Sequence, residues 1–174
     1  PEAPLVATGA EEDAAQYSGR LIMAAEAGEV VSMDAKKIVI KDDKTGKDHT
    51  YTLTNFQRTN SFGTFHQRPV VAVGQKVKKG DLLADTSTSD RGQIALGQNM
   101  RVAFMSWNGA NFEDAIILSE RLIKDSKFTS IYIAEFTCVV RDTKLGPEIT
   151  TRDIPNVGEA RLKDLDEEGI IRVG

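Results

Sequence analysis

Short apolar runs with strand spacing dominate the first half of the chain. Ile38 and Ile40 occupy alternate positions and therefore share one face of a strand. The polar stretch 41–48 contains Gly46, which can adopt the positive φ of a tight turn. The pattern predicts a β-hairpin built from the segments 28–32, 37–41 and 51–54.

Two further strands are predicted at 70–77 and 82–85, joined by a turn over Lys78–Asp81 in which Gly80 takes the left-handed position. Residues 73–83 follow the order Val-Gly-x-x-Val-x-x-Gly-Asp-x-Leu. This order is similar to that of barrel-sandwich hybrid modules, which include carrier domains for lipoate and biotin. The residues expected in the core are Val77, Leu82 and Leu83.

The remaining segments are less regular. Residues 1–18, rich in Ala, Glu and Asp, are interpreted as a connecting segment, and residues 57–67 as a polar loop. Ala115, Leu118 and Leu122 would lie on one face of a helix. The expected elements are strands at 101–105 and 129–136, a helix at 111–125 and a short helix at 159–165.

The composition narrows the class of protein. The chain has 174 residues, 40% hydrophobic and 28% charged, which is ordinary for a globular protein that buries a core. Its net charge of -4 is unlike that of a free-standing nucleic-acid binder, so a nucleic-acid role would require a larger assembly. No apolar run reaches the roughly 18 residues of a membrane span, and the first residues, Pro1-Glu2-Ala3-Pro4, lack the basic start and apolar stretch of a signal peptide.

Cys138, the single cysteine, excludes an internal disulfide and a cysteine-rich zinc site. It stands in an apolar run, which favours a buried thiol and a reducing cytoplasm. The chain begins without Met and ends on the apolar run 170–174, so we expect an internal piece of a longer protein.

Several polar residues have both a structural and a functional interpretation. His66 is expected to be a hydrogen-bonded loop residue rather than a catalytic one, and His49 to be exposed. Lys78 and Lys79 suit a solvated turn better than a nucleic-acid contact. Trp107 is expected to pack beneath the turn that follows it rather than to stack on a base.

Glu113 and Asp114 form the candidate functional site. Mg²⁺ takes one or two protein carboxylates and completes its octahedron with water and phosphates, so the pair suits an ion that arrives with a nucleotide. Alternatively, Asn111 caps a helix and the two acids favour its exposed amides. Spacing alone does not choose between these interpretations.

Longer motifs resemble a known family, the beta subunit of bacterial-type DNA-directed RNA polymerase. Smaller matches, in the same order along the chain, lie at 4–6, 67–69 and 80–85. Departures at Ser106, Ala110, Ile149-Thr150 and His66 affect only local loops. The main motifs are Ala103-Phe104-Met105, Trp107-Asn108-Gly109, Asn111-Phe112-Glu113-Asp114, Ile117–Arg121, Arg141–Glu148 and Arg152–Glu159.

The resemblance implies a mainly β fold with short helices. Residues 1–18 would connect, residues 19–100 would form a barrel-sandwich hybrid domain, and residues 101–174 would begin a double-psi β-barrel that sequence beyond Gly174 completes. The family's partners are the beta-prime, alpha and other polymerase subunits, template DNA, the RNA transcript and ribonucleoside triphosphates.

For the site, the resemblance implies a nucleotidyltransferase reaction that the chain alone cannot perform. The catalytic Mg²⁺ would be held mainly by the beta-prime subunit, and a second ion would arrive with the nucleotide. Glu113 and Asp114 would support that second ion directly or through water. Such a protein works in the bacterial cytoplasm or in a plastid.

Two alternatives remain at this stage. A lipoyl or biotinyl carrier needs a lysine at a hairpin tip within a short motif, and the nearest approach, Met33-Asp34-Ala35-Lys36, does not match. A non-catalytic β-rich adaptor would use most of these residues for contacts with other subunits.

Overall fold

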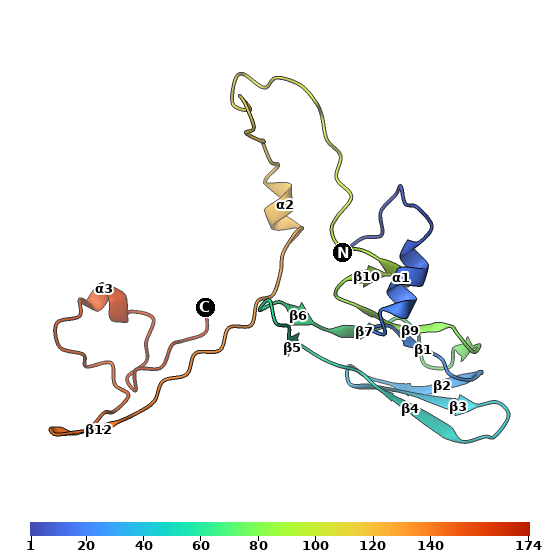
Figure 1. Cartoon of the computed structure of the whole chain (residues 1–174), viewed down its shortest axis with the longest axis horizontal. Helices are drawn as coiled ribbons and strands as arrows, with labels where there is room; N and C mark the ends of the chain where they lie inside the picture. The colour runs from blue at the N-terminus through green and yellow to red at the C-terminus, as the bar shows by residue number, and fades with distance from the viewer. The chain divides into compact units, whose positions relative to one another are not determined.

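The computed structural model describes residues 1–174, which divide into two compact units at 1–134 and 135–174. Figure 1 shows that the strands of the first unit, β1–β11, all belong to its N-terminal part and precede helix α2. In the first unit the elements are α1 (Glu11–Tyr17), β1 (Ile22–Met23), β2 (Gly28–Met33), β3 (Lys37–Asp42), β4 (Asp48–Thr52), β5 (Gln57–Arg58), β6 (Thr64–Phe65), β7 (Gln67–Pro69), β8 (Lys76–Val77), β9 (Leu82–Thr86), β10 (Ser89–Asp90), β11 (Gln93–Ile94) and α2 (Arg121–Lys124). In the second they are β12 (Asp142–Thr143), β13 (Gly146–Pro147) and α3 (Glu159–Leu162).

The predicted hairpin of the first half is confirmed, although its returning strand, expected at 51–54, is formed by Asp48–Thr52. β2, β3 and β4 pair antiparallel in a four-stranded sheet of order β4-β3-β2-β8. Alternation places Ile38 and Ile40 on the buried face, at 0% and 2% exposure. Gly46 closes the polar turn between β3 and β4 with a φ of 67°.

The strands on either side of Gly80 belong to different sheets. β8 joins the sheet of β2, whereas β9 lies between β1 and β7 in a three-stranded sheet. The turn is present, with Gly80 at a φ of 88°, so the left-handed position is confirmed. It carries the chain from one sheet to the other, and of the predicted strand 70–77 only Lys76–Val77 is a strand.

The core lies between these two sheets. Val77 and Leu83 are buried as predicted, whereas Leu82 is only partly buried. Tyr51, on β4, is partly buried and packs against this core. The buried members are Ala24, Val30, Ile38, Ile40, Leu53, Val71, Val77, Leu83 and Ala84.

Helix α1 lies inside the segment that was predicted only to connect. Ala15 is its buried residue. A carboxylate anchors the first turn, because Glu11 accepts hydrogen bonds from the amide and hydroxyl of Thr8, both at 2.8 Å. These bonds, followed by one from the Gly9 amide, lower the pKa of Glu11 to about 2.

The elements predicted after residue 100 are mostly absent. No strand forms at 101–105 or 129–136, so these two predictions are wrong. Of the helix at 111–125 only Arg121–Lys124 is helical, and the helix at 159–165 is limited to Glu159–Leu162. A short helix needs tertiary contacts to be stable.

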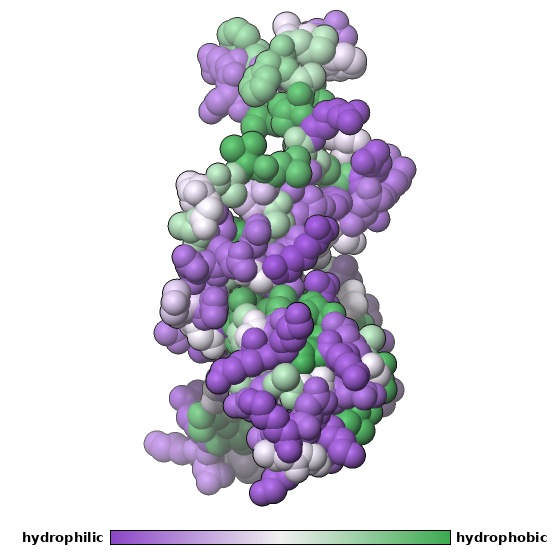
Figure 2. All heavy atoms as spheres, turned by 90° about the vertical axis from the view of Figure 1, so that its right-hand side faces the viewer, coloured by the Kyte–Doolittle hydropathy of each residue, from purple (hydrophilic) through white to green (hydrophobic).

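Those contacts are missing within this chain. Phe104 and Phe136 are 98% and 94% exposed, and Cys138 is exposed, so the prediction of a buried thiol is wrong. Figure 2 shows hydrophobic residues, in green, at the surface among hydrophilic ones. Apolar side chains of this kind are usually buried in folded proteins, and this chain contains no surface that covers them.

The fold class is mainly β with few short helices, as predicted. The sheets are small and open: one of four strands, one of three and three of two, and none closes into a barrel. No helix has the length and apolar character that a membrane crossing demands.

Candidate acidic loop

The segment 100–126, which we call the acidic loop, carries the candidate site. A turn at its centre is built by Asn108 and Gly109, whose φ angles are 49° and 74°. The side chain of Asn111 ties this turn to the residues before it. Its Oδ1 accepts a hydrogen bond from the Trp107 amide at 2.9 Å, and its Nδ2 donates to the Met105 carbonyl at 2.7 Å.

This geometry overturns the capping interpretation. No helix begins at Asn111, whose side chain is already used by the preceding backbone. Glu113 adopts a φ of 58°, a left-handed backbone conformation that residues other than glycine rarely adopt. This conformation is incompatible with the first turn of an α-helix. The acidic pair therefore stands in a loop.

Glu113 and Asp114 are adjacent and exposed. Neither carboxylate takes part in a hydrogen bond or an ion pair within the chain. Their oxygens thus face solvent, where a ligand from outside the chain can reach them. Nowhere in residues 1–174 do three His, Cys, Asp or Glu side chains gather as a metal site would require.

Helix α2 follows the acidic pair and carries ion pairs of its own. Arg121 Nε lies 3.3 Å from an Asp125 oxygen, and Lys124 Nζ lies 3.0 Å from a Glu120 oxygen. Both pairs have the i,i+4 spacing of a helix surface. They are largely exposed, so each contributes little to stability.

The other candidate residues have structural surroundings. His66 stacks on Phe56 with ring centroids 4.3 Å apart, and its Nδ1 is buried without a hydrogen-bond partner, contrary to prediction. His49 is exposed as predicted and lies 3.9 Å from Asp42. Trp107 is 54% exposed and is not covered by its turn, so that prediction is wrong.

The lysines singled out from the sequence lie on turns. Lys78 and Lys79 are exposed in the turn before β9, as predicted. Lys36 lies at the tip between β2 and β3, where Asp34 Oδ1 accepts its amide hydrogen bond at 2.7 Å. Lys36 thus has the exposed hairpin position of a carrier lysine, without the residues of a carrier motif.

Asp85 on β9 is a buried carboxylate whose structural role was not predicted from the sequence. It is 2% exposed and accepts hydrogen bonds from Ser89 Oγ, Arg91 N and Gly92 N at 2.8, 2.8 and 3.0 Å. Ser89 begins β10, and Arg91 and Gly92 form the turn between β10 and β11. The carboxylate therefore fixes the β10–β11 hairpin, and nothing in the sequence pattern marks Asp85 as buried.

The polar loop 57–67 forms the β5–β6 hairpin, which also carries pairs of arginine and aromatic side chains. The Arg58 guanidinium lies 5.0 Å from the ring centre of Phe62, and that of Arg20 lies 5.1 Å from Phe65. Arg20, Arg58 and Phe62 are exposed. Pairs of this kind occur about once per 70–80 residues in proteins, so these two do not by themselves indicate a ligand.

Comparison with known proteins identifies the family. Residues 23–174 match the family described as RNA polymerase Rpb2, domain 6, and the chain belongs to this family. Over 174 residues, 99% of this chain, it is 55% identical to the DNA-directed RNA polymerase subunit beta of Sorangium cellulosum (strain So ce56). The resemblance seen in the sequence is confirmed, and the chain spans 13% of that relative's length.

Proposed function

We propose that this chain works as part of the beta subunit of a DNA-directed RNA polymerase, which makes RNA from ribonucleoside triphosphates on a DNA template. The observation that carries the proposal is the 55% identity to such a subunit, over nearly the whole chain. The family match over residues 23–174 supports it independently of any one motif. The chain contributes to a nucleotidyltransferase and has no activity alone.

In this proposal Glu113 and Asp114 lie near the Mg²⁺ that arrives with the nucleotide. Two exposed, adjacent carboxylates fit an ion that keeps its water and phosphate ligands, and they are too few to hold one alone. The ion would supply neutralisation of phosphate charge as the RNA 3′-hydroxyl attacks the α-phosphate and pyrophosphate leaves. The two acids attract and orient it, directly or through water.

The larger complex also accounts for the exposed apolar residues after position 100. In our proposal residues 19–100 form a barrel-sandwich hybrid domain after the connecting residues 1–18. Residues 101–174 begin a double-psi β-barrel that further polymerase sequence completes. The high exposure of Phe104 and Phe136 supports this, since barrel strands need partners that the chain lacks.

The proposed partners are the beta-prime, alpha and other polymerase subunits, the template DNA and the RNA transcript. The beta-prime subunit would hold the catalytic Mg²⁺. The exposed Arg58 and Phe62 of the β5–β6 hairpin suit contact with a nucleic acid despite the net charge of -4. The protein would act in the cytoplasm of a bacterium, or in a plastid.

Substitution of Asp114 tests the site assignment. Asp114→Ala, placed in the beta subunit of the assembled polymerase, is expected to slow single-nucleotide addition about tenfold or more, because charge stabilisation near the phosphates is lost. Glu113→Ala should slow it in the same direction. Glu120→Ala is the matched control, since Glu120 is an exposed carboxylate of the same loop.

Two results would count against the proposal. Nucleotide addition at the wild-type rate by both Asp114→Ala and Glu113→Ala would leave the chain as a non-catalytic adaptor within the polymerase. A covalent lipoyl or biotinyl group on Lys36, found by mass spectrometry of the purified protein, would favour the carrier alternative instead.

A further inference from the structure

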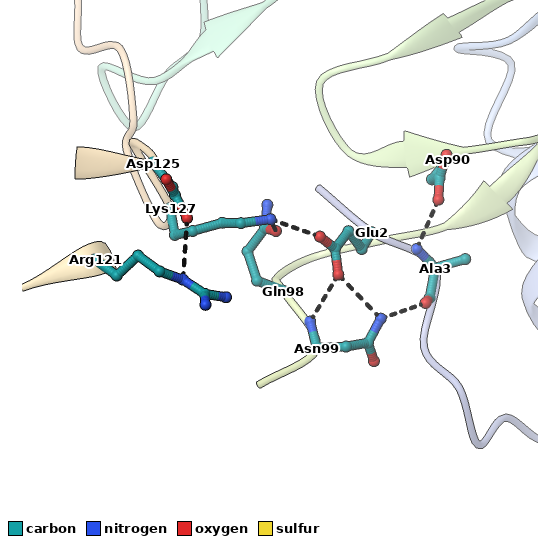
Figure 3. Close-up of polar contacts among 8 residues, drawn as sticks. All are labelled: Glu2, Ala3, Asp90, Gln98, Asn99, Arg121, Asp125 and Lys127. Atoms are coloured by element: carbon teal, nitrogen blue, oxygen red, sulfur yellow. Dashed lines mark hydrogen bonds and ion pairs between the residues drawn. The ribbon is translucent and has the colours of Figure 1, made fainter. Parts of the chain in front are cut away.

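One carboxylate joins three parts of the first unit that are far apart in sequence: its own N-terminal segment, Asn99 and Lys127. Figure 3 shows Glu2 facing both Asn99 and Lys127. Its Oε1 accepts a hydrogen bond from Lys127 Nζ at 2.8 Å, and its Oε2 accepts from the Asn99 amide at 3.2 Å and from Asn99 Nδ2 at 3.4 Å. Glu2 and Lys127 are 125 positions apart in sequence.

The surrounding groups extend this network, which we call the polar clasp: Glu2, Gln98, Asn99 and Lys127. Lys127 Nζ also donates to Gln98 Oε1 at 3.1 Å, and Asn99 Nδ2 donates to the Ala3 carbonyl at 2.9 Å. The backbone repeats the connection, because the Glu2 amide donates to the Gly97 carbonyl at 2.8 Å. The clasp therefore rests on several independent contacts.

The Glu2–Lys127 pair differs from the other ion pairs of the chain. Its N–O distance of 2.8 Å is the shortest, and its side chains, 35% and 39% exposed, are the only pair with both partners below 40%. The hydrogen bond from Lys127 and then the bond from the Asn99 amide hold the pKa of Glu2 below its usual range. The Glu2 carboxylate is thus charged at neutral pH and lies in direct hydrogen-bonding distance of Lys127 Nζ.

The clasp closes the base of the acidic loop. Asn99 directly precedes the loop and Lys127 directly follows it, and both bind the same carboxylate. All hydrogen bonds of residues 100–126 stay within residues 105–127. The loop that carries Glu113 and Asp114 is therefore joined to the sheets of the first unit at its two ends and nowhere between.

We propose that Glu2, Asn99 and Lys127 are positioning residues that hold the acidic loop in place for nucleotide addition. This inference rests on the proposed role of Glu113 and Asp114. The next contact after Lys127 is at Ile131, whose carbonyl accepts a hydrogen bond from Thr64 Oγ1 at 2.8 Å, so the clasp shortens the segment that is free between its anchors. A shorter closed loop samples fewer conformations, and closing its base therefore restricts where its acids lie. Opening the clasp lowers the chance that both acids meet the nucleotide's ion.

The test uses the assembled polymerase with Lys127→Met in the beta subunit. This substitution keeps the length of the side chain and removes its charge and its donors. We expect the Mg²⁺ concentration for half-maximal single-nucleotide addition to rise about threefold, the effect of one partly shielded ion pair. Lys127→Arg, which keeps the charge and the donors, should restore the wild-type Mg²⁺ dependence.

The exposed pair Glu120–Lys124 provides the matched control. Lys124→Met removes an ion pair of 3.0 Å from the same loop without touching the clasp, and it should leave the Mg²⁺ dependence unchanged. Wild-type Mg²⁺ dependence in Lys127→Met would overturn the inference. So would a rate lowered equally at all Mg²⁺ concentrations, because that indicates damage to the fold and not displacement of the acids.

A combined variant separates this inference from the proposed function. If Asp114→Ala alone has no effect, the site assignment fails first. If Asp114→Ala slows the enzyme and Lys127→Met does not, only the clasp fails. If the clasp acts through the acids, adding Lys127→Met to the Glu113→Ala, Asp114→Ala double variant causes no further shift, whereas an additive shift would show that it acts elsewhere.

Discussion

Single carboxylates organise the turns of this chain. Asp34 and Asp42 accept amide hydrogen bonds from residues that follow them, and Asp85 does so from a buried position. Each satisfies backbone donors that a tight turn leaves unpaired. Glu113 and Asp114 accept no such bonds, which separates the proposed site from the acids that maintain structure.

Asp42 gives this structural role a pH dependence. Its oxygens accept from Thr45 Oγ1 and from the Lys44 amide, both at 2.7 Å, and these bonds, with Thr45 first, lower the pKa of Asp42. Since the folded pKa is depressed, the stabilisation is complete above the unfolded value of about 3.9 and is lost as pH falls through the folded pKa.

We therefore expect the turn between β3 and β4 to loosen only in acid. Amide resonances of Lys44 and Thr45 should move in an NMR titration below about pH 4, as the carboxylate is protonated. Asp42→Asn should show no such transition in this range. Unchanged wild-type amide resonances down to about pH 2 would contradict the assignment.

At the scale of elements, the pairing of β2 with β3 depends on the close approach of the Gly28 backbone to the backbone of Lys41. A Cβ atom at Gly28 would clash with the carbonyl oxygen of Lys41 and would lie 2.8 Å from Ile40 Cγ2. The neighbouring strand is part of the buried sheet and cannot move without disturbing Ile40 and its partner Val30. Gly28 is thus required by packing.

Gly28→Ala is expected to lower the free energy of unfolding by about 1–3 kcal/mol, the usual effect of an extra buried group in a filled core. Urea denaturation of the whole chain, followed by circular dichroism, measures it. Gly97→Ala is the control, because a Cβ there meets nothing within 4 Å, and its effect should stay within about 0.5 kcal/mol. Equal stability of the two variants would contradict the clash.

The elements differ in how far their sequence predicts them. β2 and β3 were predictable because Ile38 and Ile40 alternate within one strand and Gly46 marks the turn. Helix α1 was not predicted, although Thr8 and Glu11 have the spacing of a capping box. The separation of β8 from β9 depends on distant partners at β2 and β7, which no local pattern contains.

The same distinction applies to the candidate site. Glu113 and Asp114 were found through a motif, whereas their loop conformation, with the positive φ of Glu113, was not predicted. The helix expected there needed a surface on which Leu118 could pack, and Leu118 is 70% exposed. The clasp was not predictable either, because its residues come together only in the folded chain.

At the scale of the whole molecule, the exposed apolar side chains after residue 100 predict self-association. Phe104, Phe112 and Phe136 are 98%, 75% and 94% exposed. Burying such surface between copies is favourable, so the isolated chain should show concentration-dependent sedimentation. Changing all three to Ser should reduce it markedly.

The control changes an equal number of exposed apolar residues before the first sheet. Leu5, Val6 and Tyr17 are 86%, 91% and 83% exposed, and replacing them with Ser should alter sedimentation much less. If both triple variants behave alike, association does not depend on the later segment. A monomeric wild-type chain at all concentrations would contradict the prediction altogether.

The bridge between Glu2 and Gly97 brings together two points of the backbone, and all seven antiparallel strand pairs of the first unit lie between them in sequence. Because the segment from Glu2 to Gly97 begins and ends at the same place, the distance between its two ends does not depend on how many residues it contains. Extra residues at the outer hairpins, such as the tip near Gly46, can therefore accumulate during evolution without displacing whatever is attached at that junction.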